Sequence, residues 1–135
     1  MKELTLPATV ENIAAVTDFV TGQLEALDCP MKAQFQISIA IDELFGNIAH
    51  YAYHPGTGDA TVRFEADDSG VTITFIDRGA PYDPLTAESP DTTLSADERI
   101  PGGLGIFMVR KSMDDMTYRR ENGLNILTIR KNLRS

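Results

Sequence analysis

The stretch AQFQISIAIDELFGNIAHYAY, which runs from Ala33 to Tyr53, decides the fold. At roughly 3.6 residues per turn it is long enough for about five helical turns. Its apolar residues recur with the period of a helix rather than that of a strand. They form a broad stripe made of Phe35, Ile39, Leu44 and Ile48, with Ile37 and Ile41 adding width. We therefore expect one long helix that packs against a core.

Two polar residues, Glu43 and Asn47, interrupt this apolar stretch. They are four residues apart and therefore project from the same face of the helix. Burying a carboxylate and an amide without hydrogen-bond partners would cost on the order of several kcal/mol. These two side chains therefore need contact with either solvent or a ligand. Two interpretations stay open at this point. The pair is a solvated polar stripe, which is common on helices, or it offers a base for a proton beside an oxygen ligand for a cation.

The rest of the chain alternates between helical and strand periods. Turn residues separate the strands into two hairpins, one around Asp67–Gly70 and one around Glu121–Gly123. In chain order we expect a strand over Lys2–Leu6, a helix over Val10–Asp28, strands over Ala60–Ala66 and Val71–Ile76, a helix from Gly102 through Met113, and strands over Met116–Arg120 and Leu124–Lys131.

This order of elements predicts the fold class. Strands that follow one another through hairpins, with helices grouped elsewhere, indicate an α+β protein. We expect a two-layer sandwich over residues 1–135 as a single domain, with a mixed, mostly antiparallel sheet and the helices on one face. Between the hairpin and the last helix, Ala80–Pro101 contains four prolines and has no periodicity. Connections longer than about 15 residues are usually functional, so this loop is predicted to be a lid.

Composition excludes several classes of function. With 20 acidic and 12 basic residues the net charge is −8, which argues against nucleic acid as a direct ligand. Cys29 is the only cysteine, so no intrachain disulfide can form, as is usual in a reducing compartment. The first ten residues do not resemble a signal peptide. No stretch approaches the roughly 20 apolar residues of a membrane span. We expect a cytoplasmic protein that has no membrane partner.

Two glycine-containing motifs could carry chemistry. Asp77-Arg78-Gly79 follows an apolar strand, where the carboxylate could accept a hydrogen bond from an amine and Gly79 could let the backbone approach a planar ring. Gly102–Gly105 opens a helix whose free N–H groups suit phosphate. Each motif alone also fits a simple role, as a turn and as a hinge. Neither a Walker A loop nor a dinucleotide-binding fingerprint is present.

Taken in order, the motifs resemble the histidine kinase-like ATPase superfamily, which includes DNA gyrase, the heat-shock chaperone, sensor histidine kinases and mismatch-repair ATPases. Glu43–Asn47 resembles its N box, Asp77–Gly79 its first glycine box and Gly103–Gly105 its second. The free-standing anti-sigma-factor serine/threonine kinases are most similar. That likeness is carried by His50 and Tyr51 after Asn47, by Pro81-Tyr82-Asp83-Pro84, and by the size of the chain.

The resemblance implies a Bergerat-type fold that binds ATP and Mg²⁺. It implies phosphorylation of an anti-anti-sigma partner and sequestration of a sigma factor, with a homodimer left open. It assigns proton acceptance to Glu43, Mg²⁺ to Asn47, the adenine amine to Asp77, and the nucleotide also to the backbone at Gly79, Gly103, Leu104 and Gly105. Two alternatives remain: a nucleotide-gated binding module that transfers no phosphate, and a catalytic fragment like that of a histidine kinase.

The chain departs from the family pattern at Gly123-Leu124-Asn125. Members of the family usually carry a Gly-Thr pair near the C-terminal hairpin, and the threonine helps to line the adenine pocket. Because no threonine is present here, the contact with the base must differ in this chain.

The predicted lid leads to a test by limited proteolysis. If Ala80–Pro101 closes over a bound nucleotide, a protease should cut it in the free protein and cut it much less when an ATP analogue is bound. Cleavage at the turn Asp67–Gly70 serves as the internal control and should not change. Equal cleavage of the long loop in both states would count against a lid.

Overall fold

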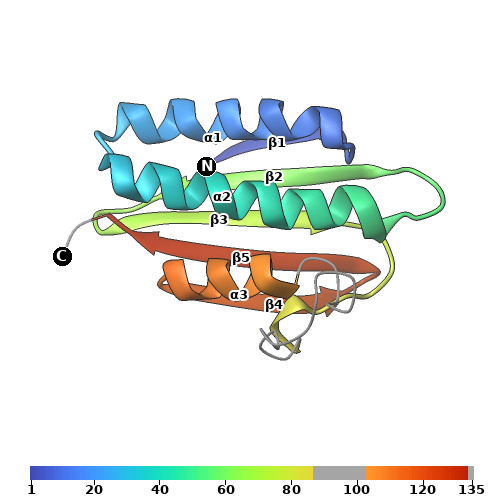
Figure 1. The fold of residues 1–135 in the computed structure, drawn as a ribbon. Coiled ribbons are helices and arrows are strands. Elements are labelled where there is room, and N and C mark those ends of the chain that lie inside the picture. Colours follow the sequence, from blue (N-terminus) through green and yellow to red (C-terminus); the bar gives the residue numbers. More distant parts are fainter. Residues whose placement is uncertain (87–102, 134–135) are drawn as a thin grey trace.

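The computed structural model describes residues 1–86 and 103–133, and Figure 1 shows two layers. The elements of the described part follow the predicted order. The strands are β1 (Lys2–Pro7), β2 (Asp59–Ala66), β3 (Gly70–Asp77), β4 (Asp115–Glu121) and β5 (Leu124–Asn132). The helices are α1 (Ile13–Ala26), α2 (Met31–Asn47) and α3 (Gly103–Ser112), with short 3₁₀ turns at Val10–Asn12 and Pro84–Thr86 and a π-helical turn, η2, at Ile48–Ala52.

One sheet contains all five described strands, in the order β1-β2-β3-β5-β4. Each of its four pairings is antiparallel, where a mixed sheet was expected. All three α-helices cover the same face of this sheet, and α2 lies between α1 and α3 (Figure 1). The α+β sandwich with helices on one face is therefore confirmed. Most of the predicted lid, residues 87–101, lies outside the described residues and stays a prediction.

Turn chemistry fixes both predicted hairpins. In the first, the Asp67 carboxylate accepts hydrogen bonds from the backbone N–H groups of Ser69 and Gly70, both at 2.9 Å. The guanidinium of Arg130 on β5 also binds this carboxylate, and with the two N–H groups it holds the pKa of Asp67 well below its usual range. In the second, Asn122 and Gly123 have φ of 53° and 79°, the left-handed conformation that makes Asn-Gly a strong hairpin signal.

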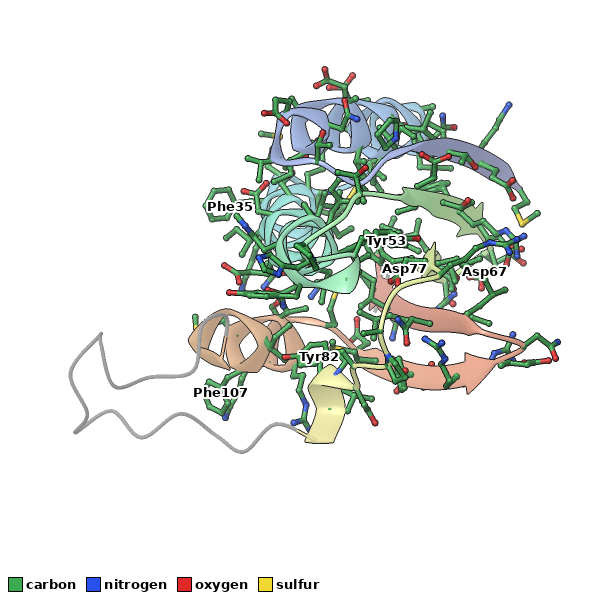
Figure 2. All side chains as sticks on the ribbon, turned by 90° about the vertical axis from the view of Figure 1, so that its right-hand side faces the viewer. Phe35, Tyr53, Asp67, Asp77, Tyr82 and Phe107 are labelled. Atoms are coloured by element: carbon green, nitrogen blue, oxygen red, sulfur yellow. The ribbon has the colours of Figure 1, made fainter. Side chains whose placement is uncertain are left out.

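The buried face of α2 differs from the predicted stripe. Phe35 and Ile39 were expected to pack inward, but they are 68% and 40% exposed. At about 100° per residue both lie nearly opposite Ile37, which is fully buried. Figure 2 shows Phe35 pointing away from the sheet. The residues of α2 that are buried are Ala33, Ile37, Ala40, Ile41, Leu44, Phe45 and Gly46.

The C-terminal end of α2 also departs from the prediction of a regular helix to Tyr53. The helix changes to the π-helical turn η2 after Asn47, and such turns often occur at functional sites. Tyr53 follows this turn and links the start of β2 to the residue after β3. Its hydroxyl donates a hydrogen bond to the Asp59 carbonyl at 2.6 Å and accepts one from the Arg78 N–H at 2.7 Å.

The two faces of α2 predict very different costs for the same substitution. Phe45→Ala should lower the free energy of unfolding by about 3–5 kcal/mol, because Phe45 is fully buried and its removal leaves a cavity. Phe35→Ala is the matched control on the same helix and should change stability by less than about 0.5 kcal/mol. Urea denaturation followed by circular dichroism measures both. Equal losses of unfolding free energy in the two variants would mean that the face of α2 that carries Phe45 is not the buried one.

Candidate functional site

A cavity of about 350 Å³ lies between the helix layer and the ends of β3 and β5. A volume of this order falls at the lower end of the range of small-molecule sites, roughly 300–1,000 Å³. Its wall is mostly apolar, with few polar side chains. The lining residues are Leu44, Asn47, Ile48, Tyr51, Ala52, Asp77, Ala80, Pro81, Tyr82, Pro84, Ile106, Tyr118, Asn125 and Leu127.

Asp77 lies at the inner end of this cavity because of the alternation along β3. Ile73 and Phe75 point toward the helices and are buried, and Asp77 occupies the next inward position. The side chain is only 5% exposed. Its Oδ1 atom accepts hydrogen bonds from the Gly79 N–H at 2.8 Å and from Asn125 Nδ2 at 2.9 Å. The predicted carboxylate acceptor is therefore present, buried and supported.

Gly79 contacts protein backbone. A Cβ atom at this position would overlap the carbonyl group of Ala52 in η2. The next residue, Ala80, donates its N–H to the same carbonyl at 2.9 Å. Glycine at position 79 thus lets the loop after β3 pack tightly on the end of the α2 segment. Gly79 is not among the lining residues, so its expected contact with a planar ring stays a prediction.

Glu43 and Asn47 lie on the flank of α2 that faces α3, and both are half-buried. Asn47 lines the cavity, whereas Glu43 lies one turn earlier, outside its lining. The Glu43 carboxylate is so close to the first turn of α3 that a Cβ atom on Gly105 would overlap it. The fold therefore brings the first and third predicted motifs into contact.

The start of α3 completes this end of the site. Gly103 and Leu104 form its first turn with Gly105, which lies against the Glu43 carboxylate. One residue further on, Ile106 is buried and lines the cavity wall. A helix N-terminus next to a pocket favours anions through its free N–H groups and the positive end of the helix dipole.

Two tyrosines stand at the cavity rim. Tyr51 and Tyr82 are 49% and 46% exposed, and Figure 2 shows Tyr82 below Asp77, in front of the lower part of the molecule. Burial raises the pKa of Tyr82, and the nearby Tyr51 and Asp83 raise it further. Both side chains present aromatic surface to a molecule that enters the cavity.

Asn125 is the site residue that sequence reasoning missed. It is 6% exposed and lies opposite Asp77 in the β3–β5 register. The sequence carried a signal for it, because the alternation of the buried Leu127 and Ile129 makes position 125 the next inward one.

A resident metal would depend on few protein ligands. Within residues 1–86 and 103–133, no three His, Cys, Asp or Glu side chains come together in a way that could hold a metal ion. Asn47 offers one amide oxygen at the cavity wall. This fits Mg²⁺ that arrives with a nucleotide, because Mg²⁺ keeps several waters and takes most of its other ligands from phosphates.

Comparisons with known proteins agree with this geometry. Residues 6–131 match the family described as histidine kinase-like ATPase domain. The chain is 33% identical over 99 residues to the serine/threonine-protein kinase BtrW of Bordetella bronchiseptica. The aligned region covers 73% of this chain and 70% of that protein. It is 26% identical over 130 residues to the serine-protein kinase RsbW of Staphylococcus aureus (strain JH9), covering 92% and 82% respectively.

The chain therefore belongs to the histidine kinase-like ATPase domain family, so the family resemblance is confirmed, while the roles of its three motifs stay predictions. Membership in an ATPase family implies the use of ATP. In addition, no helix among the described residues is long and apolar enough to cross a membrane.

The packing of Gly79 on η2 can be tested without any ligand. Gly79→Ala should lower the free energy of unfolding by about 1–3 kcal/mol, because the added methyl group overlaps the backbone carbonyl of Ala52. Gly22→Ala in α1 is the matched control. No atom lies within 4 Å of its added Cβ, so it should stabilise the protein by about 0.5–1 kcal/mol through helix propensity. Two stability changes of the same sign would contradict the close contact at Gly79.

Proposed function

We infer that this protein is an ATP- and Mg²⁺-dependent protein serine/threonine kinase. One observation carries the proposal: a buried carboxylate and an amide line one apolar cavity, and a second carboxylate on the same helix as the amide lies against the first turn of α3, in a chain of the histidine kinase-like ATPase family. The two relatives named above are protein kinases by name, which supports the same class of reaction here.

The cavity would hold the nucleobase and the α2–α3 junction would hold the phosphates. Apolar walls at Leu44, Ile48 and Ile106 suit the faces of a planar ring. Asp77 is an acceptor at the inner end and would bind the exocyclic amine of adenine. The first turn of α3, at Gly103–Gly105, would approach the phosphates through backbone N–H groups.

Asn47 would link the protein to the cation. Its side-chain amide lines the cavity from the last turn of α2, and in this proposal it would lie between the base and the phosphates. Bound Mg²⁺ would neutralise charge on the phosphates and align them for transfer. The protein supplies only one oxygen ligand in this arrangement, so binding of cation and nucleotide should depend on each other.

Glu43 would accept the proton of the attacking hydroxyl. It lies one helical turn from Asn47 and against Gly105, so its carboxylate would be beside the phosphates in this proposal. A half-buried carboxylate at this place can reach a hydroxyl that enters from outside the protein. Glu43 is not among the residues that line the cavity, so we propose no part for it in base binding.

The identity of the protein substrate follows from the resemblance of the motifs to anti-sigma-factor kinases. We propose that the hydroxyl belongs to a serine or threonine of an anti-anti-sigma-type partner and that the kinase also sequesters a sigma factor, in the cytoplasm and as a homodimer or a monomer. Tyr51, Pro81 and Tyr82, which carried part of that resemblance, line the cavity and are exposed, so a partner could reach them.

Substitutions at Glu43 and Asn47 should have different effects. Glu43→Ala should leave ATP affinity nearly unchanged and slow phosphate transfer to the partner by about 10²- to 10⁴-fold, the usual scale for a positioned general base. Asn47→Ala should lose Mg²⁺-dependent binding and transfer together. Calorimetry measures binding, and transfer of radiolabelled phosphate to a partner co-purified from the host measures catalysis.

Asp42→Ala is the control for Glu43, because Asp42 is the adjacent acid on α2 but is exposed on another face of the helix. It should retain both binding and transfer. If the wild-type protein binds ATP and partner but transfers nothing, and Glu43→Ala behaves identically, the protein is a nucleotide-gated binding module. Transfer that persists unchanged in Glu43→Ala would remove Glu43 as the base and favour the histidine-kinase-like alternative.

A further inference from the structure

The amide of Asn125 uses all of its hydrogen-bonding capacity at the inner end of the cavity. Its Nδ2 atom donates to Asp77 Oδ1 at 2.9 Å and to the Ala80 carbonyl at 2.9 Å. Its Oδ1 atom accepts from the Tyr118 hydroxyl at 2.5 Å and from Arg120 Nη1 at 3.1 Å. Asn125 is therefore a connection between β3, β4 and the loop after β3.

These partners allow only one orientation of the amide. A guanidinium has donors only, and a backbone carbonyl is an acceptor only. Oδ1 must therefore face Arg120, and Nδ2 must face Ala80 and Asp77. In the reverse orientation, two donors would oppose each other at Arg120 and two acceptors at Ala80. The Tyr118 hydroxyl then has to use its hydrogen on Asn125.

The register of the sheet holds this network in place. Asn125 on β5 pairs with Asp77 on β3 and with Arg120 on β4, so the three residues lie side by side across adjacent strands. Arg120 Nη1 also donates to the Gly79 carbonyl at 2.7 Å. The loop that contains Gly79 is thus tied to the β4–β5 hairpin by protein groups alone.

The consequence is a set of acceptors that face the cavity. Asp77 Oδ1 receives the N–H groups of Gly79 and Asn125, while no described residue donates a hydrogen bond to Oδ2. The oxygen of Tyr118, whose hydrogen is engaged with Asn125, offers only lone pairs. Asp77 and Tyr118 both line the cavity. A ligand group that carries N–H donors matches this end of the cavity, and a carbonyl group does not.

We propose that Asn125 is a positioning residue that fixes Asp77 as a hydrogen-bond acceptor and thereby makes the cavity selective for a nucleobase with an amino group. This inference rests on the proposed nucleotide-binding function of the cavity. In this proposal Tyr118 and Arg120 hold the Asn125 amide, and Asn125 in turn orients the Asp77 carboxylate. A hydrogen-bond donor to Asp77 is therefore present although the second hairpin has no Gly-Thr pair.

The test compares two ligands that differ only in the amino group: ATP, and purine riboside triphosphate, which has hydrogen in place of the 6-amino group. Calorimetry in the presence of Mg²⁺ should show that the wild-type protein binds ATP about 10- to 100-fold more tightly, the scale of a hydrogen bond to a charged group. Asn125→Ala should lose about tenfold in ATP affinity and change little toward the analogue, so the preference should largely disappear.

Two further variants separate positioning from folding. Asn125→Thr keeps one hydroxyl donor for Asp77 and should recover part of the preference. Tyr118→Phe keeps the ring but removes the donor to Asn125, and should reduce the preference several-fold even if Asn125→Ala does not fold. Asn132→Ala, an exposed asparagine at the far end of β5, is the control and should bind both ligands as the wild type does.

The outcomes distinguish this inference from the proposed function. If the wild-type protein binds neither nucleotide, the proposed function is wrong. If it binds both equally, or if Asn125→Ala and Tyr118→Phe keep the full preference for ATP, nucleotide binding stands and the role of Asn125 is overturned. A loss of affinity for both ligands in equal proportion would mean that Asn125 has only a structural role.

Discussion

Burial of the Asp77 carboxylate is the constraint on which this end of the molecule depends. A charged group that is 5% exposed is costly unless hydrogen bonds compensate for its lost solvation. Its donors, Gly79 and Asn125, come from the following loop and from β5. The first donor requires the loop to fold back onto η2, and the second requires the β3–β5 register. The same arrangement that compensates the charge also shapes an apolar cavity around it.

The second organising feature is that two sides of α2 make different contacts. One face of this helix carries Ile37 and Phe45 into the core, and its flank carries Glu43 and Asn47 toward α3. The rigidity of the packed face therefore positions the functional flank. The close approach of Glu43 to Gly105 shows how tightly the two helices meet, because only glycine leaves room for the carboxylate there. The carboxylate of Glu43, the amide of Asn47 and the first turn of α3 come together as a result.

Much of the fold could be predicted from local pattern. Strand alternation and turn chemistry at Asp67–Gly70 and Asn122-Gly123 predicted both hairpins, and helical period predicted the three helices. The motif residues Glu43, Asn47 and Asp77 were also found from sequence, and the structure brings Asn47 and Asp77 to one cavity. Their chemical roles remain proposals. What failed was the expectation that Phe35 and Ile39 face inward, since both are exposed, while the other residues of the predicted stripe, Ile37, Ile41, Leu44 and Ile48, are buried.

The sequence by itself determined the elements, their order and the polar residues that interrupt apolar runs, because these depend on the periods of helix and strand and on short-range turn preferences. Only the tertiary structure decided which side of α2 is buried, why position 79 must be glycine, and that Asn125 supports Asp77. Those features depend on neighbours that are distant in the chain: residues 77 and 125 are 48 apart and meet through strand pairing. The buried face of α2 is defined only once α1, α3 and the sheet pack around it. Likewise, the Asp77 carboxylate gains Asn125 as a partner only once β3 and β5 are in register.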